Sequence, residues 1–396
     1  MPRIYLDNNA TTPVHPDVIE AMLPFYRNSF GNPSCIHWAG KAVKGALEKA
    51  RMQVASLVNC TPAEVVFTSG GSESINTAIK GAAAARRTRG NHIISTRVEH
   101  SAVFNCCRYL EKEGFRVTYL EVDAEGMLDL NALAAAITDQ TILIAAMYAN
   151  NETGVIFPIE KIGEIVKEKG IPFHTDAVQT IGKIPVNLKK SAIDMLSLSG
   201  HKLHSPKGIG VLYIRKGTKF SPFLIGGHQE KGRRGGTENV PYIIGLGKAC
   251  ELAKKHMEDE NTRVKALRDY LEQKILEKIP STLVNGDPVH RLPNTVSVSF
   301  EYVEGESILL LLSDLGICAS SGSACTSGSL EPSHVLRAMG VPFTAAHGSI
   351  RFSLSIYNTK EEMDYIIEHL PPIIQRLRDI SPFWHDYLKS QGKKSS

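Results

Sequence analysis

The sequence lacks the features that would tie a protein to a membrane or an export route. Its longest apolar runs, near residues 142–146 and 308–312, are far too short to cross a bilayer. The first residues show no charged lead followed by an apolar core, so neither export nor organelle import is indicated. We therefore expect a cytoplasmic protein with no membrane partner.

Strong charge and paired cysteines are also missing. Lys and Arg outnumber Asp and Glu by only 45 to 41, a margin too small to indicate nucleic acid or an anionic surface as the main partner. Seven cysteines, an odd number, contain no CxxC pair, so we expect neither a zinc site nor a disulfide framework in a reducing compartment. Each thiol must be judged by its neighbours in the chain.

What the sequence does contain is a long alternation of strand and helix patterns. Short β-branched runs alternate with helical patterns from about residue 65 to 215, which predicts βα units and a mainly parallel sheet. The strands are expected at residues 65–67, 92–96, 117–122, 142–147, 172–175, 195–199 and 210–214. Beyond about residue 261 a charged helix, a strand at 294–300, a helix at 307–315 and a strand at 349–354 are expected. The fold class is therefore α/β, with a large domain of residues 15–260 and a smaller α+β domain of residues 1–14 and 261–396.

Polar groups gather where the predicted strands end, which is where ligands bind in open α/β sheets. After the first strand, residues 68–73 read Thr-Ser-Gly-Gly-Ser-Glu and lead into a helix, an arrangement that can hold a phosphate on free backbone N–H groups. Taken alone, this stretch fits an ordinary capped turn better. Glu99-His100 and Asn150-Asn151-Glu152 follow other strands, and a lone histidine is more often structural than catalytic.

Two strand ends together point to a cofactor. Asp176 follows one strand and Gln179 lies one helical turn further, while Ser199-Gly200-His201-Lys202 follows another. Pyridoxal phosphate requires a lysine that bonds to its aldehyde and then moves a substrate proton, and a carboxylate that keeps its ring nitrogen protonated. Separately, Lys202 could be a surface lysine and Asp176 a helix cap. Jointly, with the Gly-Ser turn and His100 at the same edge, they predict a pyridoxal phosphate site.

Three later segments add candidate groups. Residues 226–237 form a basic, glycine-rich loop without aromatic neighbours, so phosphate neutralisation, including across a dimer interface, fits better than nucleic-acid binding. Cys325 lies among small polar residues, which predicts an exposed thiol on a mobile loop, although a tolerated surface cysteine is the simple alternative. Arg351 lies on a predicted strand and could hold a carboxylate in bidentate fashion or make an ordinary ion pair.

Ten motifs, in order along almost the whole chain, resemble the cysteine desulfurases of the nitrogen-fixation and iron–sulfur-cluster type. They read YLDNNATTP, FGNPS, FTSGGSES, EHSAV, NNETG, HTDAVQ, SGHKLHSPKGIG, GGTEN, EGES and SSGSACTS. These enzymes are class V relatives of the aminotransferases with fold type I of the pyridoxal phosphate enzymes. The stretch around Cys325 is similar to that of the first desulfurase group, whose catalytic cysteine can reach a protein acceptor.

The resemblance implies an activity and a set of roles. L-Cysteine would yield L-alanine and a persulfide on Cys325, whose sulfur would pass to an iron–sulfur scaffold or another acceptor protein. Lys202 would bond to the cofactor, and His100 would lie over its ring as an acid or base. The other cofactor contacts would be Gly71, Ser72, Asn151, Asp176 at the ring nitrogen, Gln179 at the ring hydroxyl, Ser199, His201 and the partner subunit's Thr237. Arg351 and Asn151 would bind the substrate. The protein would be a homodimer without a metal site of its own, although Cys325 could transiently touch an iron–sulfur cluster on the scaffold.

Other functions stay open at this point. A selenocysteine lyase or a sulfur donor for tRNA thiolation would use the same groups, and an ordinary aminotransferase would need no thiol loop. A sulfur-carrying interaction protein with an inactive cofactor site is a different class of function. The presence of both Lys202 and Asp176 argues against it.

Overall fold

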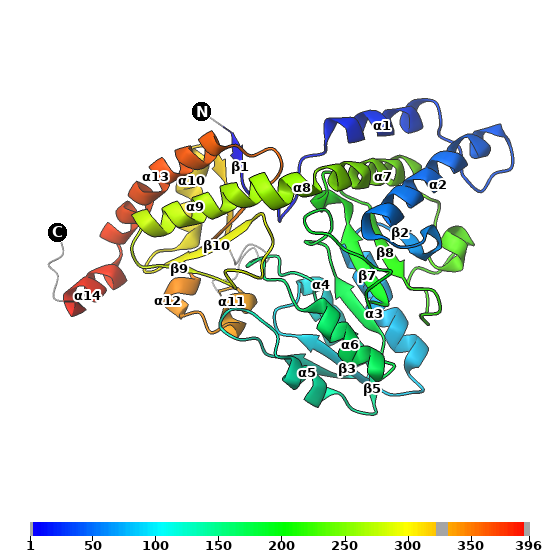
Figure 1. Cartoon of the computed structure of the whole chain (residues 1–396), viewed down its shortest axis with the longest axis horizontal. Coiled ribbons are helices and arrows are strands. Elements are labelled where there is room, and N and C mark those ends of the chain that lie inside the picture. Colours follow the sequence, from blue (N-terminus) through cyan, green and yellow to red (C-terminus); the bar gives the residue numbers. More distant parts are fainter. Residues whose placement is uncertain (1–2, 322–331, 392–396) are drawn as a thin grey trace.

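The larger part of the protein is built on one seven-stranded sheet. The computed structural model describes residues 3–321 and 332–391. The strand order is β2 (Val65–Thr68), β8 (Gly210–Ile214), β7 (Met195–Ser199), β6 (Phe173–Asp176), β5 (Thr141–Ala145), β3 (His92–Thr96) and β4 (Arg116–Leu120). Only β8 runs antiparallel to its neighbours in this sheet. The expected α/β class with a mainly parallel seven-stranded sheet is confirmed (Figure 1).

Helices cover both faces of this sheet, which explains why its inner strands are buried on both sides. One face packs against α3 (Gly71–Arg86) and α4 (Ser101–Lys112). The other packs against α2 (Trp38–Val58), α6 (Ile159–Glu168) and α7 (Val240–Lys255). The short helices α1 (Pro16–Arg27) and α5 (Leu130–Ala136) and the 3₁₀ turns η1 (Pro62–Glu64), η2 (Gly200–Lys202) and η3 (Gln229–Gly232) complete this part.

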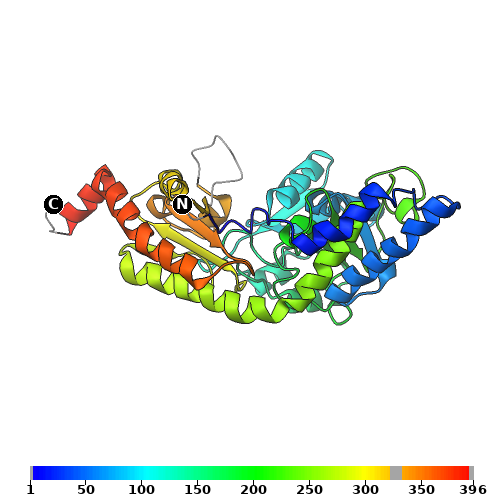
Figure 2. The same ribbon diagram turned by 90° about the horizontal axis from the view of Figure 1, so that it is seen from above.

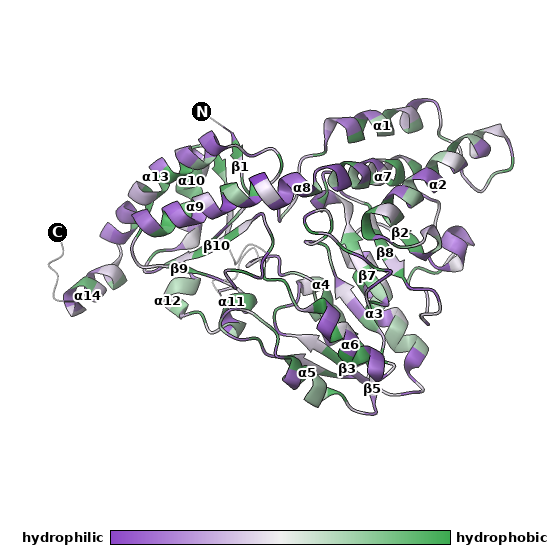
Figure 3. Ribbon diagram, in the orientation of Figure 1, coloured by the Kyte–Doolittle hydropathy of each residue, from purple (hydrophilic) through white to green (hydrophobic). Residues whose placement is uncertain are grey.

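A second lobe has its own sheet and its own core. Its four antiparallel strands follow the order β12 (Ser320–Ser321), β13 (Ser349–Ser353), β10 (Thr295–Phe300) and β9 (Thr282–Val284). The helices α9 (Lys265–Lys278), α10 (Gly305–Asp314) and α13 (Lys360–Asp379) contribute apolar residues to this core, and Figure 3 shows many hydrophilic residues along α9 and α13. The N-terminal β1 (Ile4–Tyr5) pairs with β11 (Ile317–Cys318), and α14 (Pro382–Ser390) follows at the C-terminal end.

A run of consecutive helices joins the two lobes. After α7 the chain continues through α8 (Met257–Asp259) and the π-helical turn η4 (Glu260–Val264) into α9, and Figures 1 and 2 show this run passing from one lobe to the other. The predicted domain boundary at residue 261 falls inside this run and stays a prediction. No helix among the described residues is long and apolar enough to span a membrane.

One helix of the C-terminal third packs with the large sheet instead of the small one. Val335 and Leu336 of α11 (His334–Ala338), followed by Met339, belong to the same buried cluster as the residues of α2 and α6. The neighbouring α12 (Phe343–Ala346) then leads back to β13. The chain therefore crosses to the large sheet and returns within about 30 residues.

We predict that this crossing stabilises the fold. Leu336→Ala should lower the free energy of unfolding by about 2–5 kcal/mol, because a side chain only 1% exposed leaves a cavity when truncated. Leu310→Ala is the matched control, since this helical leucine is 69% exposed and should change the free energy by no more than about 0.5 kcal/mol. Urea denaturation of both variants measures the difference, and equal values would show that α11 adds nothing to the core.

Candidate active site

A cavity of about 320 Å³ lies at the carboxyl ends of the large sheet, where side chains from both lobes meet. Ten of the twelve residues predicted from the sequence line it: Gly71, Ser72, His100, Asn151, Asp176, Gln179, Ser199, His201, Lys202 and Arg351. Thr237 is exposed and does not line the cavity, while Cys325 lies outside the described residues. The structure thus brings the ten residues together, and the role of each stays a prediction.

Parallel strand pairing explains how the central groups meet. Asp176 ends β6 and Ser199 ends β7, and these two strands are parallel neighbours. The turn η2 follows β7 directly and carries His201 and Lys202. His100 enters from another strand end as the N-cap of α4, where its Nδ1 accepts a hydrogen bond from the Ala102 amide at 3.1 Å.

The first turn of α3 provides an anion site at one end of the cavity. Gly71 begins this helix, so its free backbone N–H groups face the space that Ser72 and Ser199 also line. A Cβ atom on Gly71 would lie 2.9 Å from Val178 Cγ2, so a larger residue would push the helix start away from the sheet. Gly71 therefore allows the start of α3 to pack closely against Val178, which also lines the cavity.

Lys202 has the surroundings of a reactive amine. Its Nζ donates hydrogen bonds to the backbone carbonyls of Asn9 and Ala10, the latter at 2.7 Å. Burial lowers the pKa of Lys202 to about 7, and the like charges of Lys183 and Arg351 act in the same direction. A large fraction of the amine is consequently unprotonated and nucleophilic near neutral pH.

Three further polar groups face the cavity with unused bonding capacity. Burial raises the pKa of Asp176, against the favourable charges of His100 and Lys202 and a hydrogen bond from the Val178 amide at 3.0 Å. Burial lowers the pKa of His100, so its ring tends to be neutral. Gln179 Nε2 donates to Asn9 O at 2.8 Å, whereas its Oε1 has no partner in residues 3–321 and 332–391. These groups fit a polar aromatic ligand that carries a protonated ring nitrogen and a hydroxyl.

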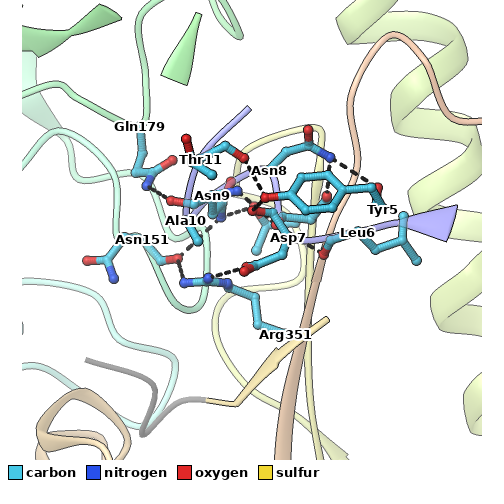
Figure 4. Close-up of polar contacts among 12 residues, drawn as sticks. Tyr5, Leu6, Asp7, Asn8, Asn9, Ala10, Thr11, Asn151, Gln179 and Arg351 are labelled. Atoms are coloured by element: carbon cyan, nitrogen blue, oxygen red, sulfur yellow. Dashed lines mark hydrogen bonds and ion pairs between the residues drawn. The ribbon is translucent and has the colours of Figure 1, made fainter. Parts of the chain in front are cut away.

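Arg351 reaches the cavity from β13 of the small lobe (Figure 4). One of its terminal nitrogens donates to Asn151 O at 2.9 Å and the other pairs with Asp7 at 2.8 Å. Its Nε has no partner within the described part of the chain. The prediction placed Arg351 correctly on a strand but missed Asp7 and Asn9, although the N-terminal YLDNNATTP motif that contains them was among the matching motifs.

Glu152 is a second group that the sequence reasoning did not assign. It lines the cavity, and it accepts a hydrogen bond from Ser333 Oγ at 2.5 Å. Burial raises the pKa of this carboxyl, with Ser333, His334 and Arg351 opposing. Ser320 and Ser321 line the same cavity, so residues on both sides of the segment 322–331 lie at or next to it.

The two arginines of the basic loop at residues 226–237 have partners within the chain. Arg233 donates to the backbone carbonyls of Ala63 and Val65, and Arg234 pairs with Glu73 at 2.9 Å. The buried Glu230 of this loop forms a bidentate pair with Arg51. These interactions account for Arg233 and Arg234, whereas phosphate neutralisation by the loop across a dimer interface stays a prediction.

Comparison with known proteins identifies the family. The model of the aminotransferase class-V family matches residues 4–366. Cysteine desulfurase 2 of Trichormus variabilis is 60% identical over 383 residues, which cover 97% of this chain and 96% of that protein. Cysteine desulfurase NifS of Azotobacter vinelandii is 56% identical over 385 residues, with the same coverage.

Solved structures agree with the sequences. A NifS-like protein superimposes with a TM-score of 0.90 at 41% identity, over 95% of this chain and 100% of that one. SspA in complex with cysteine superimposes with a TM-score of 0.80 at 39% identity, over 90% of this chain and 100% of that one. The chain therefore belongs to the aminotransferase class-V family and, within it, to the NifS-like cysteine desulfurases.

Proposed function

We propose that the protein is a pyridoxal phosphate-dependent cysteine desulfurase that transfers the sulfur of L-cysteine to Cys325. L-Cysteine and the Cys325 thiol give L-alanine and a Cys325 persulfide, so no external oxidant or reductant is needed for this step. The observation that supports the proposal best is the single cavity that joins Lys202, with its lowered pKa, to Asp176 and Arg351. The relatives named cysteine desulfurase support the same chemistry.

The residues that line the cavity fit the cofactor. The N-terminus of α3 with Ser72, Ser199 and His201 would hold the phosphate, Asp176 the ring nitrogen and Gln179 the ring hydroxyl. His100 and Asn151 would lie beside the ring. When bound, pyridoxal phosphate supplies an electron sink for the bonds at the substrate α-carbon.

The chain's own groups would handle the substrate and its protons. Arg351 would bind the substrate carboxylate, because a guanidinium buried at the cavity wall offers directed N–H donors. Lys202 Nζ would take and return the proton at the substrate α-carbon, for which an amine with a pKa of about 7 is suited. The neutral ring of His100 would accept or donate a proton at the substrate thiol.

Chain length lets Cys325 meet the substrate in this cavity. Cys325 is four residues beyond Ser321, and four residues span up to about 14 Å when extended. The sulfur would then pass from Cys325 to an acceptor protein, for which an iron–sulfur scaffold is our first candidate. We further propose a cytoplasmic homodimer in which the partner subunit's Thr237 contacts the cofactor phosphate.

The central prediction concerns the two reacting groups. Lys202→Ala and Cys325→Ala should each lower cysteine-dependent sulfide release by at least about a hundredfold, because each removes a group that moves a proton or attacks sulfur. Sulfide and alanine, measured with added reductant, should appear in equal amounts from the unaltered enzyme. Cys318→Ala is the matched control, since Cys318 is an exposed thiol that does not line the cavity and should be dispensable. Full activity of Cys325→Ala would refute the persulfide and favour another lyase or an aminotransferase.

A second prediction tests the ring-nitrogen contact. Asp176→Asn should lower kcat by about a hundredfold or more while the protein still binds the cofactor, because an amide cannot hold a proton on the ring nitrogen through charge. Asp194→Asn removes a carboxylate that lies away from the cavity and should leave kcat unchanged. Steady-state kinetics together with the visible spectrum of each purified variant separate lost turnover from lost cofactor.

A third prediction tests the carboxylate contact. Arg351→Lys should reduce kcat/KM for L-cysteine by about 10–100-fold, mainly through KM, because an ammonium cannot reproduce the forked donors of a guanidinium. Arg291→Lys, at a buried arginine paired with Glu272 in the small lobe, is the control. An unchanged KM in Arg351→Lys would assign Arg351 to structure alone.

A further inference from the structure

A second and much smaller cavity, of about 30 Å³, lies on the other side of Lys202. Lys202 lines both cavities, while Lys183 and Glu260 line only the small one. The space is large enough for one or two water molecules and too small for a substrate. Its importance lies in the charged groups that surround it.

Lys183 is the unusual member of this group. Its side chain is buried, and its Nζ has no hydrogen-bond partner in residues 3–321 and 332–391. Its backbone carbonyl accepts a hydrogen bond from Asn261 Nδ2 at 2.8 Å, which fixes the segment to the helices that join the lobes. Burial of a lysine without a direct partner destabilises the folded state, because the ammonium group loses its water. The position of Lys183 therefore calls for a physical explanation.

The segment of Lys183 packs directly on the turn that carries Lys202. Gly182 has a φ of +84°, and a Cβ atom at this position would overlap the side chain of Leu203, the residue after Lys202. Only glycine therefore allows the two segments to approach so closely. This contact places the Lys183 segment beside the turn, and both lysines line the same small cavity.

Glu260 supplies the opposing charge. It begins the π-helical turn η4, it is buried, and its Oε2 has no partner in the described part of the chain. Burial raises the pKa of Glu260 to about 7, and the charge of Lys183 acts against this rise. Burial also lowers the pKa of Lys183, and Glu260 opposes that change, so each group helps to keep the other ionised.

The other ionisable groups around the two lysines do not cancel this effect. His15, His204 and His256 line the small cavity, and burial, with Lys183, lowers the pKa of His204 to about 4. Arg351 acts on Lys202 in the same direction as Lys183, whereas Asp7 and Asp176 oppose them. After burial itself, Lys183 is the largest influence that lowers the pKa of Lys202.

We propose that Lys183 is a positioning residue whose buried ammonium group, balanced by Glu260, drives the proton off the Lys202 amine. Without this cation, a larger fraction of the Lys202 amine would hold its proton at neutral pH, and the amine would react more slowly with an aldehyde. This inference rests on the proposed role of Lys202 in cofactor binding and adds a reason for the second buried lysine beside it.

The test measures the Lys202 amine directly and needs neither cofactor nor cysteine. The full-length chain, freed of cofactor, is labelled with acetic anhydride across a range of pH, and the extent of labelling at Lys202 is read by peptide mass spectrometry. Lys183→Met should move the midpoint for Lys202 upward by about one pH unit, which slows labelling at pH 7 by about fivefold when the starting pKa is about 7. Lys183→Arg should keep the original midpoint, because it keeps the charge.

Two controls separate charge from structure. Lys190→Met removes the same charge from an exposed position in the same region of the chain and should leave the midpoint unchanged. If Lys183→Met lowers the melting temperature, the double variant Lys183→Met with Glu260→Gln leaves no unpaired buried charge at the pair and should show the same upward shift. An unmoved midpoint in a folded Lys183→Met or double variant would overturn the inference. A shifted midpoint in a chain without desulfurase activity would instead keep this inference and remove the proposed function.

Discussion

The parallel pairing of β6 with β7 is the constraint on which the site depends. The register sets Asp176 opposite Ser197, so that Asp176 and the turn after Ser199 emerge at the same edge of the sheet. Neither strand could slip by one residue without turning Asp176 to the other face. Backbone hydrogen bonds between the two strands thus fix where the carboxylate and the turn that carries Lys202 begin.

Burial of charged groups gives this site its reactivity, and it also lowers the stability of the fold. Asp176, Glu152 and Lys202 all have pKa values moved toward their neutral forms, because the cavity replaces water with protein. Isolated buried charges would destabilise the fold by several kcal/mol each. The apolar clusters on both faces of the large sheet offset this loss of stability, and the helices that contribute to them support the strands that carry the site.

The sequence predicted the strands and the strand-end residues well, because strand period and turn chemistry are local properties. β3, β7 and β8 have the predicted bounds, and ten predicted site residues share one cavity. The contact of Asp7 with Arg351 was not predicted, because the two residues lie far apart along the chain. Asp7 and Arg351 are 344 positions apart, and no period or spacing encodes such a contact. The partners of Arg233 and Arg234 were not predicted either, since Ala63 and Glu73 lie more than 150 positions earlier in the chain.

The N-terminal residues explain how groups from two lobes form one site. The Asn9 amide N–H donates to Ser353 Oγ at 2.9 Å in the small lobe, and its backbone carbonyl accepts from Gln179 of the large lobe at 2.8 Å. Lys202 donates to the same carbonyl, so the reactive lysine and the strand that carries Arg351 are linked through one residue. A relative movement of the lobes would therefore have to break bonds to Asn9 before it could separate Arg351 from Lys202. This makes the first strand and the loop after it part of the active site, although none of their side chains has to react.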